Sequence, residues 1–239
     1  MGYIEIMIVT EICGDSLADL SKAITAGAER FELNLALSLG GITPSLGLLR
    51  EALRMIKAAG RPEPVKIMAM VRPHGGGFCY DDFDFAVMLE DTRILVENGA
   101  AGIVFGILNA DGTIDKERCR TMMRTIGTAE GVFHRAIDLC PDWKAALDML
   151  CDLGVRRVLT SGHAPNVEAG LQTLKEMVAY ANGRIEILPG GGVRRHNVLR
   201  LIAETGCTQV HFSLRKAGSE TGLSQAELQD LMAAIQGRC

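Results

Sequence analysis

Polar residues that can transfer a proton or bind a metal recur inside short apolar segments of this chain. Glu11 and Cys13 lie two residues apart in one such segment, and Glu32 and Asn34 repeat the spacing in the next. Because side chains alternate across a β-strand, both members of each pair face the same side of a sheet. If that side is the interior of the fold, two carboxylates converge beside a thiol and an amide, as acid–base chemistry or metal binding requires.

Later apolar segments carry further residues of the same kind. Arg72 ends one segment before a glycine-rich stretch, and His134 and Asp138 share one face of another. For an enzyme that acts on a small polar or phosphorylated metabolite, we predict that His134 and either Glu11 or Glu32 transfer protons. In this hypothesis Arg72 binds an anionic group, and Asp138 orients His134 or replaces it.

The segments that carry these residues alternate with helical patterns. In most repeats a helix-like stretch ends at a glycine and an apolar segment follows within a few residues, as at Gly60 before residues 65–71. A glycine past a helix adopts the left-handed conformation that ends the helix, and the strand that follows pairs parallel with its predecessor. Repeated strand–helix units therefore predict an α/β fold with a parallel sheet.

The repeats predict one (β/α)8 TIM-barrel domain over residues 1–239, since such barrels have ~250 residues and place their chemistry at the carboxyl ends of the strands. Isolated buried charges are costly, so an interior that holds these residues requires their mutual pairing. Whether His211, in the last strand, faces the barrel mouth or an outer helix stays open. The predicted strands span residues 6–13, 30–35, 65–72, 102–107, 131–138, 156–161, 184–188 and 209–214, and the predicted helices span residues 16–26, 45–59, 83–97, 116–125, 143–153, 167–180, 195–204 and 225–236.

The composition argues against several functional classes. The net charge is −4 and no run of Lys or Arg occurs, so a nucleic-acid partner is not expected. No apolar run reaches the ~20 residues that cross a bilayer, and no signal-peptide pattern is present, so we expect a cytoplasmic protein without a membrane partner. The seven cysteines form no CxxC motif, as expected for reduced thiols in such a compartment.

Two glycine-rich loops follow late strands of the predicted barrel. Ser161 and Gly162 come after the sixth strand, and Gly190, Gly191 and Gly192 come after the seventh. Such loops often bind phosphate in barrels, because exposed N–H groups and a helix N-terminus favour an anion. The same glycines would also make tight strand-to-helix turns. Both interpretations stay open.

A set of motifs in fixed order distinguishes this chain from other barrels. They are Glu11-Ile12-Cys13, Arg30-Phe31-Glu32-Leu33, Gly40-Gly41-Ile42-Thr43-Pro44-Ser45, Arg72-Pro73 with Gly75-Gly76, Phe133-His134-Arg135-Ala136, Leu159-Thr160-Ser161-Gly162 and Pro189-Gly190-Gly191-Gly192-Val193. Together they resemble the copper homeostasis protein CutC family, from about residue 11 to residue 213. The resemblance implies a (β/α)8 barrel, a cytoplasmic location, a role in copper homeostasis through copper ion binding, and a homo-oligomer, either a dimer or a tetramer.

The resemblance also implies where copper would bind. In the family, the copper-binding cysteines fall in Glu-apolar-Cys motifs of the first two strands. This chain has Cys13 in the first motif and Asn34 in the second. Cu(I) is soft and favours sulfur ligands, so the amide removes half of the best ligands and leaves Cys13 as the expected one. The alternative is the barrel enzyme described above.

Overall fold

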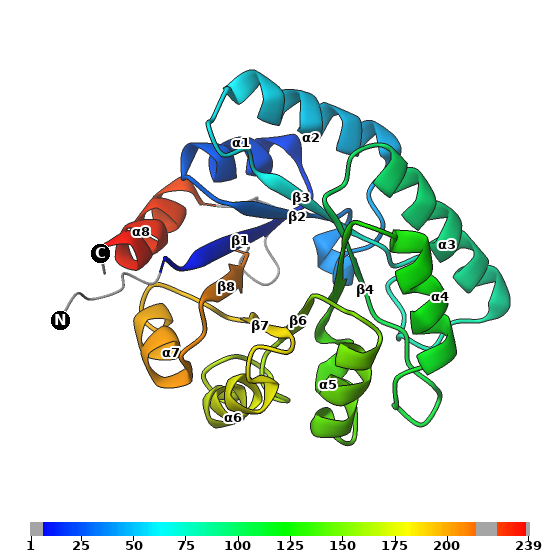
Figure 1. The fold of residues 1–239 in the computed structure, drawn as a ribbon. Coiled ribbons are helices and arrows are strands. Elements are labelled where there is room, and N and C mark those ends of the chain that lie inside the picture. The colour runs from blue at the N-terminus through cyan, green and yellow to red at the C-terminus, as the bar shows by residue number, and fades with distance from the viewer. Residues whose placement is uncertain (1–6, 214–223, 238–239) are drawn as a thin grey trace.

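The computed structural model describes residues 7–213 and 224–237, and over these residues strands and helices alternate along the chain (Figure 1). The strands are β1 (Val9–Gly14), β2 (Arg30–Leu33), β3 (Lys66–Met70), β4 (Gly102–Phe105), β5 (Glu130–Phe133), β6 (Arg157–Thr160), β7 (Glu186–Pro189) and β8 (Gln209–Phe212). The α-helices are α1 (Leu17–Thr25), α2 (Leu46–Ala59), α3 (Asp82–Glu97), α4 (Lys116–Ile126), α5 (Trp143–Asp152), α6 (Leu171–Ala181), α7 (Val198–Thr205) and α8 (Gln225–Gln236). Two short 3₁₀ helices, η1 (Leu37–Leu39) and η2 (Arg135–Leu139), follow β2 and β5.

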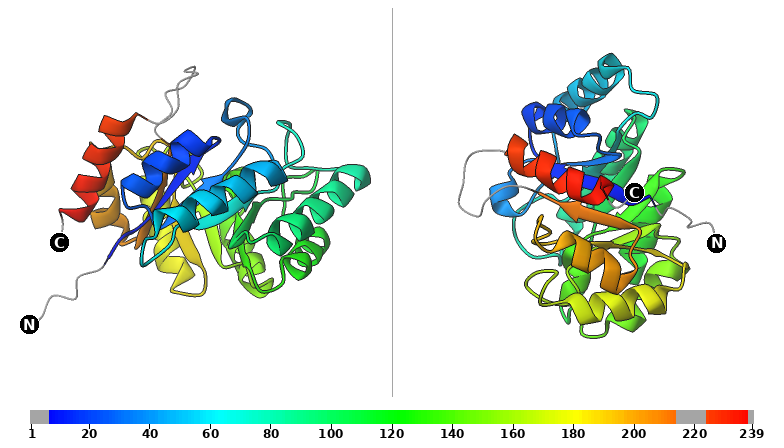
Figure 2. Two further views of the ribbon diagram at one scale, coloured as in Figure 1. Left: turned by 90° about the horizontal axis from the view of Figure 1, so that it is seen from above. Right: turned by 90° about the vertical axis from the view of Figure 1, so that its left-hand side faces the viewer.

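The strands form a nearly closed parallel barrel. Their order in the sheet is β7-β6-β5-β4-β3-β2-β1-β8, and every paired neighbour is parallel. A single parallel bridge between Gly190 and His211 joins the ends of this order, beside β7 and β8. The helices surround the strands, and α8 lies between α1 and α7 in Figure 1 and in the right view of Figure 2. The predicted TIM-barrel class is confirmed.

Local sequence signals explain where the helices begin and end. The hydroxyl of Ser45 accepts a hydrogen bond from the N–H of Leu48 and caps α2. Gly60 ends that helix at a φ of 61°, which glycine adopts without strain. Between these ends, the buried residues of α2 fall at the three- and four-residue spacing of one helical face, at Leu49, Ala52 and Ile56. The other helices pack on the barrel by the same pattern.

Most of the apolar core lies between the strands and the helices. Phe31, Phe105, Phe133 and Phe212 point outward from their strands into this layer and are fully buried or nearly so. A separate, smaller apolar cluster consists of Met68, Met70, Val104 and Val132. These residues alternate with the outward-facing ones, so the cluster lies inside the barrel. Much of the remaining interior is polar.

Three differences between the structure and the predicted elements have a clear local cause. The predicted fifth strand continues to Asp138, but β5 ends at Phe133, because His134 accepts a hydrogen bond from the N–H of Ala136 and the chain turns into η2. The predicted helices at 167–180 and 195–204 begin late, at Leu171 and Val198. Asn166 and Asn197 hold the preceding turns, since their side-chain oxygens accept backbone N–H bonds.

Parts of three predictions lie outside the described residues. The predicted first strand begins at residue 6, the predicted last strand ends at residue 214, and the predicted domain covers residues 1–239. The single-domain assignment therefore stays a prediction, although α8 coincides with the predicted last helix. Within the described part of the chain, every helix is too short or too polar to cross a bilayer.

Candidate functional site

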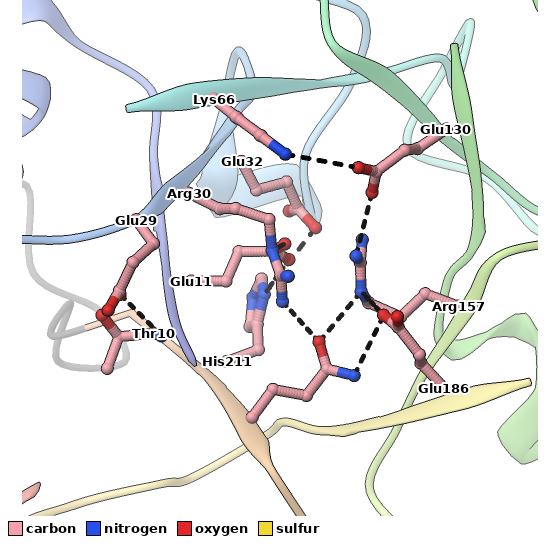
Figure 3. Close-up of polar contacts among 11 residues, drawn as sticks. Thr10, Glu11, Glu29, Arg30, Glu32, Lys66, Glu130, Arg157, Glu186 and His211 are labelled. Carbon is pink, nitrogen blue, oxygen red and sulfur yellow. Dashed lines mark hydrogen bonds and ion pairs between the residues drawn. The ribbon is translucent and has the colours of Figure 1, made fainter. Parts of the chain in front are cut away.

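A layer of paired charges occupies one level of the barrel interior (Figure 3). Arg30 of β2 donates from Nε to Oε2 of Glu11 over 2.6 Å and from Nη2 to Oε1 of Gln209. Arg157 of β6 donates from Nε to Oε1 of Gln209 and to Oε2 of Glu186, and each distance is 2.9 Å. The remaining pairs of this layer are Arg157 with Glu130 and Lys66 with Glu130. The mutual pairing that a charged interior requires is therefore present.

Three residues with metal-binding side chains converge beside this charged layer. Cys13 of β1 is in register with Glu32 of β2, and His211 of β8 is in register with Glu11 of β1. One ligand atom from each of Cys13, Glu32 and His211 lies within 4.8 Å of the others. Their exposed fractions are 6%, 3% and 7%. We call these three residues the metal-binding group.

His211 is the member that the sequence left unassigned. The structure turns it into the barrel, where its Nδ1 lies 3.0 Å from Oε1 of Glu11 and 3.9 Å from Oε2 of Glu32. The hydrogen bond to Glu11 orients the imidazole ring, as carboxylates commonly do for metal-binding histidines. The alternation of Gln209, His211 and Ser213 in the last strand was the available sequence signal.

The electrostatics of this group follow from its burial and its neighbours. Burial acts to raise the pKa of Glu11, but the hydrogen bond from His211 and the charge of Arg30 outweigh it and lower that pKa to about 2. Burial raises the pKa of Glu32, although His211 opposes it. Burial and the neighbouring Glu32 raise the pKa of the Cys13 thiol. A metal that binds there must displace the thiol proton.

Asn34 contributes to this group as a hydrogen-bond donor. Its Nδ2 lies 2.9 Å from Oε1 of Glu32 and 3.4 Å from Sγ of Cys13. The other carboxylate oxygen of Glu32, Oε2, is buried without a hydrogen bond of ordinary length, although Nδ1 of His211 lies 3.9 Å away and the Cys13 thiol interacts with the carboxylate. A buried acceptor without a donor is costly and rare. A bound cation would satisfy this oxygen.

The other predicted catalytic residues lie elsewhere in the barrel. Arg72 follows β3 and His134 follows β5, so both stand at the carboxyl ends of their strands. Phe78 contacts both, with its ring centroid 5.0 Å from Cζ of Arg72 and 4.7 Å from the ring centroid of His134. We call these residues the mouth cluster. Among the described hydrogen bonds and ion pairs, none joins His134 to Glu11 or Glu32.

Asp138 does not share a strand face with His134, contrary to the sequence prediction. It lies in η2 and accepts hydrogen bonds from the backbone N–H groups of Ser161 and His163. Its carboxylate also bonds Oγ1 of Thr160 and Nε of Arg135. The backbone N–H groups of the loop after β6 thus bind the carboxylate of Asp138, an anion from the chain itself.

This arrangement bears on the predicted phosphate-binding loops. The N–H of Ser161 donates to Asp138, and that of Gly162 donates to Oγ1 of Thr160. Gly190 donates its N–H to the carbonyl of Thr160. These three groups already have protein partners, whereas phosphate binding by Gly191 and Gly192 stays a prediction.

The sequence matches the CutC family over residues 8–216. The chain belongs to the CutC family. A family protein CutC from Treponema denticola is 46% identical over 89% of this chain and 84% of its own length. The human copper homeostasis protein cutC homolog is 40% identical, over 86% of this chain and 72% of its own length. These relatives do not favour the alternative of an enzyme acting on a metabolite.

Solved structures agree with this assignment. That of the putative copper homeostasis protein CutC from Streptococcus agalactiae is 36% identical, with a TM-score of 0.80 over 86% of this chain and 98% of that chain. The N-(5'-phosphoribosyl)anthranilate isomerase from Pyrococcus furiosus is 14% identical, with a TM-score of 0.59 over 96% of this chain and 99% of that chain. The second likeness shows the barrel fold alone.

In this CutC family chain, Gly106 sets the space for His134. A Cβ at position 106 would lie 2.3 Å from Cε1 of His134 and 2.8 Å from Cβ of Ala136. Gly106→Ala is therefore expected to displace the ring and to lower the free energy of unfolding by about 1–3 kcal/mol. Chemical denaturation measures this loss. Gly77→Ala is the control, because nothing lies within 4 Å of a Cβ there, and equal stability of the two variants would contradict the expectation.

Proposed function

We propose that this protein takes part in copper homeostasis by binding a copper ion at Cys13, Glu32 and His211. The convergence of these three buried side chains from three strands is the observation that carries the proposal. The names of the human and Streptococcus agalactiae relatives add support. A buried group of ligands restricts access by water, which favours a site that holds its ion tightly.

The donor atoms fit copper. Thiolate sulfur from Cys13 is the soft ligand that selects Cu(I), and imidazole from His211 is a common copper ligand. Glu32 adds a harder oxygen donor, and its Oε2, which has no hydrogen bond of ordinary length, supports a cation at this position. Asn34 cannot supply a second thiolate and instead donates a hydrogen bond toward Cys13. The proposal therefore assigns one sulfur ligand to this chain.

An anaerobic competition titration of Cu(I) against a chelator of known affinity tests the proposal. The unmodified protein is expected to bind one equivalent, and Cys13→Ala is expected to weaken binding at least ~100-fold, about 2.7 kcal/mol. His211→Phe removes a second ligand and is expected to weaken binding by about 10-fold or more. Cys119→Ala serves as the matched control, because Cys119 is an equally buried thiol whose sulfur lies near the carbonyl of Ile107.

Two outcomes would contradict the copper proposal. Equal Cu(I) affinity of the unmodified protein and Cys13→Ala would exclude this group as the site. Tight binding of Zn²⁺ together with weak binding of Cu(I) would mean that the site binds a divalent ion and not copper. Circular dichroism of each variant separates a lost ligand from a lost fold.

The expected cellular context belongs to the same proposal. The described cysteines are all free thiols, as in a reducing compartment such as the cytoplasm. We also propose a homo-oligomer, dimer or tetramer, on the basis of family resemblance. Light scattering of the purified protein measures that state.

A further inference from the structure

The mouth cluster contains two buried hydrogen-bond donors that have no acceptor. Nε2 of His134 and Nε of Arg72 are both enclosed and have no hydrogen bond of ordinary geometry, although the Arg72 guanidinium also interacts with the Tyr80 hydroxyl. The exposed fractions of these residues are 4% and 7%. An unsatisfied buried donor carries the full cost of its lost hydration. The side chains that carry these two donors contact the same aromatic ring, that of Phe78. One bound acceptor at this place would satisfy both donors.

The hydrogen bonds of His134 determine which ring nitrogen carries the proton. Nδ1 accepts the N–H of Ala136 over 3.1 Å, so the proton of the neutral ring resides on Nε2. Burial, with a contribution from the charge of Arg72, lowers the pKa of His134 to about 3 and keeps the ring neutral. Nε2 is thus a fixed N–H donor.

Arg72 is a buried cation without a carboxylate partner among the described ion pairs. Its Nη1 donates to the carbonyls of Leu39 and Gly41, and its Nη2 donates to the carbonyl of Gly76. These neutral acceptors hold the guanidinium but leave its charge uncompensated. The contrast with Arg30, which pairs with Glu11, is clear. A buried guanidinium is most stable beside an oxyanion, which it can bind in the plane of its N–H groups.

We propose that Arg72 and His134 bind an oxyanion, the carboxylate or phosphoryl group of a small ligand, beneath the ring of Phe78. Phe78 is half-buried and its ring packs against both side chains, and in this proposal it moves aside when the ligand enters. Its backbone stays attached to the barrel, because its carbonyl accepts the N–H of Leu108. The site stands at the carboxyl ends of β3 and β5, where TIM barrels bind their ligands.

The loop after β6 is less suited to an added anion than the mouth cluster. Asp138 already accepts the N–H groups of Ser161 and His163, so the chain's own carboxylate satisfies that loop. Arg135 lies beside Gly191, but its guanidinium is paired with the same Asp138 carboxylate. The oxyanion site shares no residue with the metal-binding group and does not depend on copper binding.

Nuclear magnetic resonance of protein labelled with ¹⁵N-histidine tests this proposal. The chain has five histidines, so the ring nitrogens of His134 can be assigned with His134→Phe. Titration with inorganic phosphate and, separately, with malonate in a HEPES and chloride buffer is expected to move the Nε2 signal of His134 saturably. A response to phosphate alone identifies a phosphoryl ligand, and a response to malonate alone identifies a carboxylate.

Variants separate a built site from general anion binding. His134→Phe and Arg72→Gln are each expected to reduce the affinity for the responding anion at least 10-fold by calorimetry, and Arg200→Gln, an exposed arginine of α7, is expected to leave it unchanged. His134→Phe should retain full Cu(I) affinity, which shows that the variant is folded and tests this site apart from the metal. No shift of His134 with either anion up to about 100 mM, or unchanged affinity in His134→Phe, would overturn the proposal.

Discussion

Arg30→Met is expected to lower the free energy of unfolding by about 3–5 kcal/mol, because it leaves a buried carboxylate without its counter-charge. Glu11 has an exposed fraction of 0%, and its low pKa depends in part on Arg30. The substitution also removes the donor that bonds Gln209. Methionine approximates the length of the arginine stem, so lost packing contributes little. Urea denaturation at pH 7 measures the effect.

A second substitution separates the lost charge from lost packing. Adding Glu11→Gln to Arg30→Met removes the uncompensated charge and is expected to recover a large part of the stability. Arg54→Met is the surface control, since Arg54 forms an exposed ion pair with Glu51 and such pairs contribute little. A loss below about 1 kcal/mol in Arg30→Met would mean that the charged interior tolerates an unpaired carboxylate, contrary to the expectation.

The stability of the protein is expected to fall between pH 6.5 and about 3 because His134 is buried and neutral. Burial lowers the pKa of His134 from 6.5 to about 3. Between these values the unfolded chain binds a proton at this residue and the folded chain does not, so stability decreases as the pH falls. At 1.36 kcal/mol per pH unit, the full difference corresponds to about 5 kcal/mol. Above pH 6.5 this residue contributes no pH dependence.

His134→Gln isolates this contribution, because glutamine retains polarity without titrating. Between pH 7 and pH 4, the unmodified protein is expected to lose about 3 kcal/mol more stability than the variant. Glu11, whose stabilisation is lost only as the pH falls from about 4.5 toward 2, acts equally in both proteins. His196→Gln is the control, since His196 is largely exposed. Parallel pH curves for the unmodified protein and His134→Gln would show that His134 titrates normally.

Much of the fold and part of the site follow from local patterns. Glycines that end helices and the short apolar segments after them predicted the barrel, because backbone conformation and alternation are local properties. The alternation of Glu11 with Cys13 and of Glu32 with Asn34 placed these residues inside. Cys13 and Glu32 do lie in register on neighbouring strands. Neighbouring strands of a βα repeat pair in chain order, so this contact was accessible from the sequence.

The tertiary structure alone decided which distant residues join these pairs. His211 meets Glu11 across 200 positions, because the barrel brings β8 beside β1. Asp138 lies in η2 and not in the predicted strand. There it accepts a backbone N–H bond from the loop after β6 and does not orient His134. The uncompensated charge of Arg72 is likewise visible only once its neighbours are placed. Pairing among buried polar groups depends on distances of a few ångströms across the barrel, whereas a sequence pattern specifies only which face of a strand each side chain occupies.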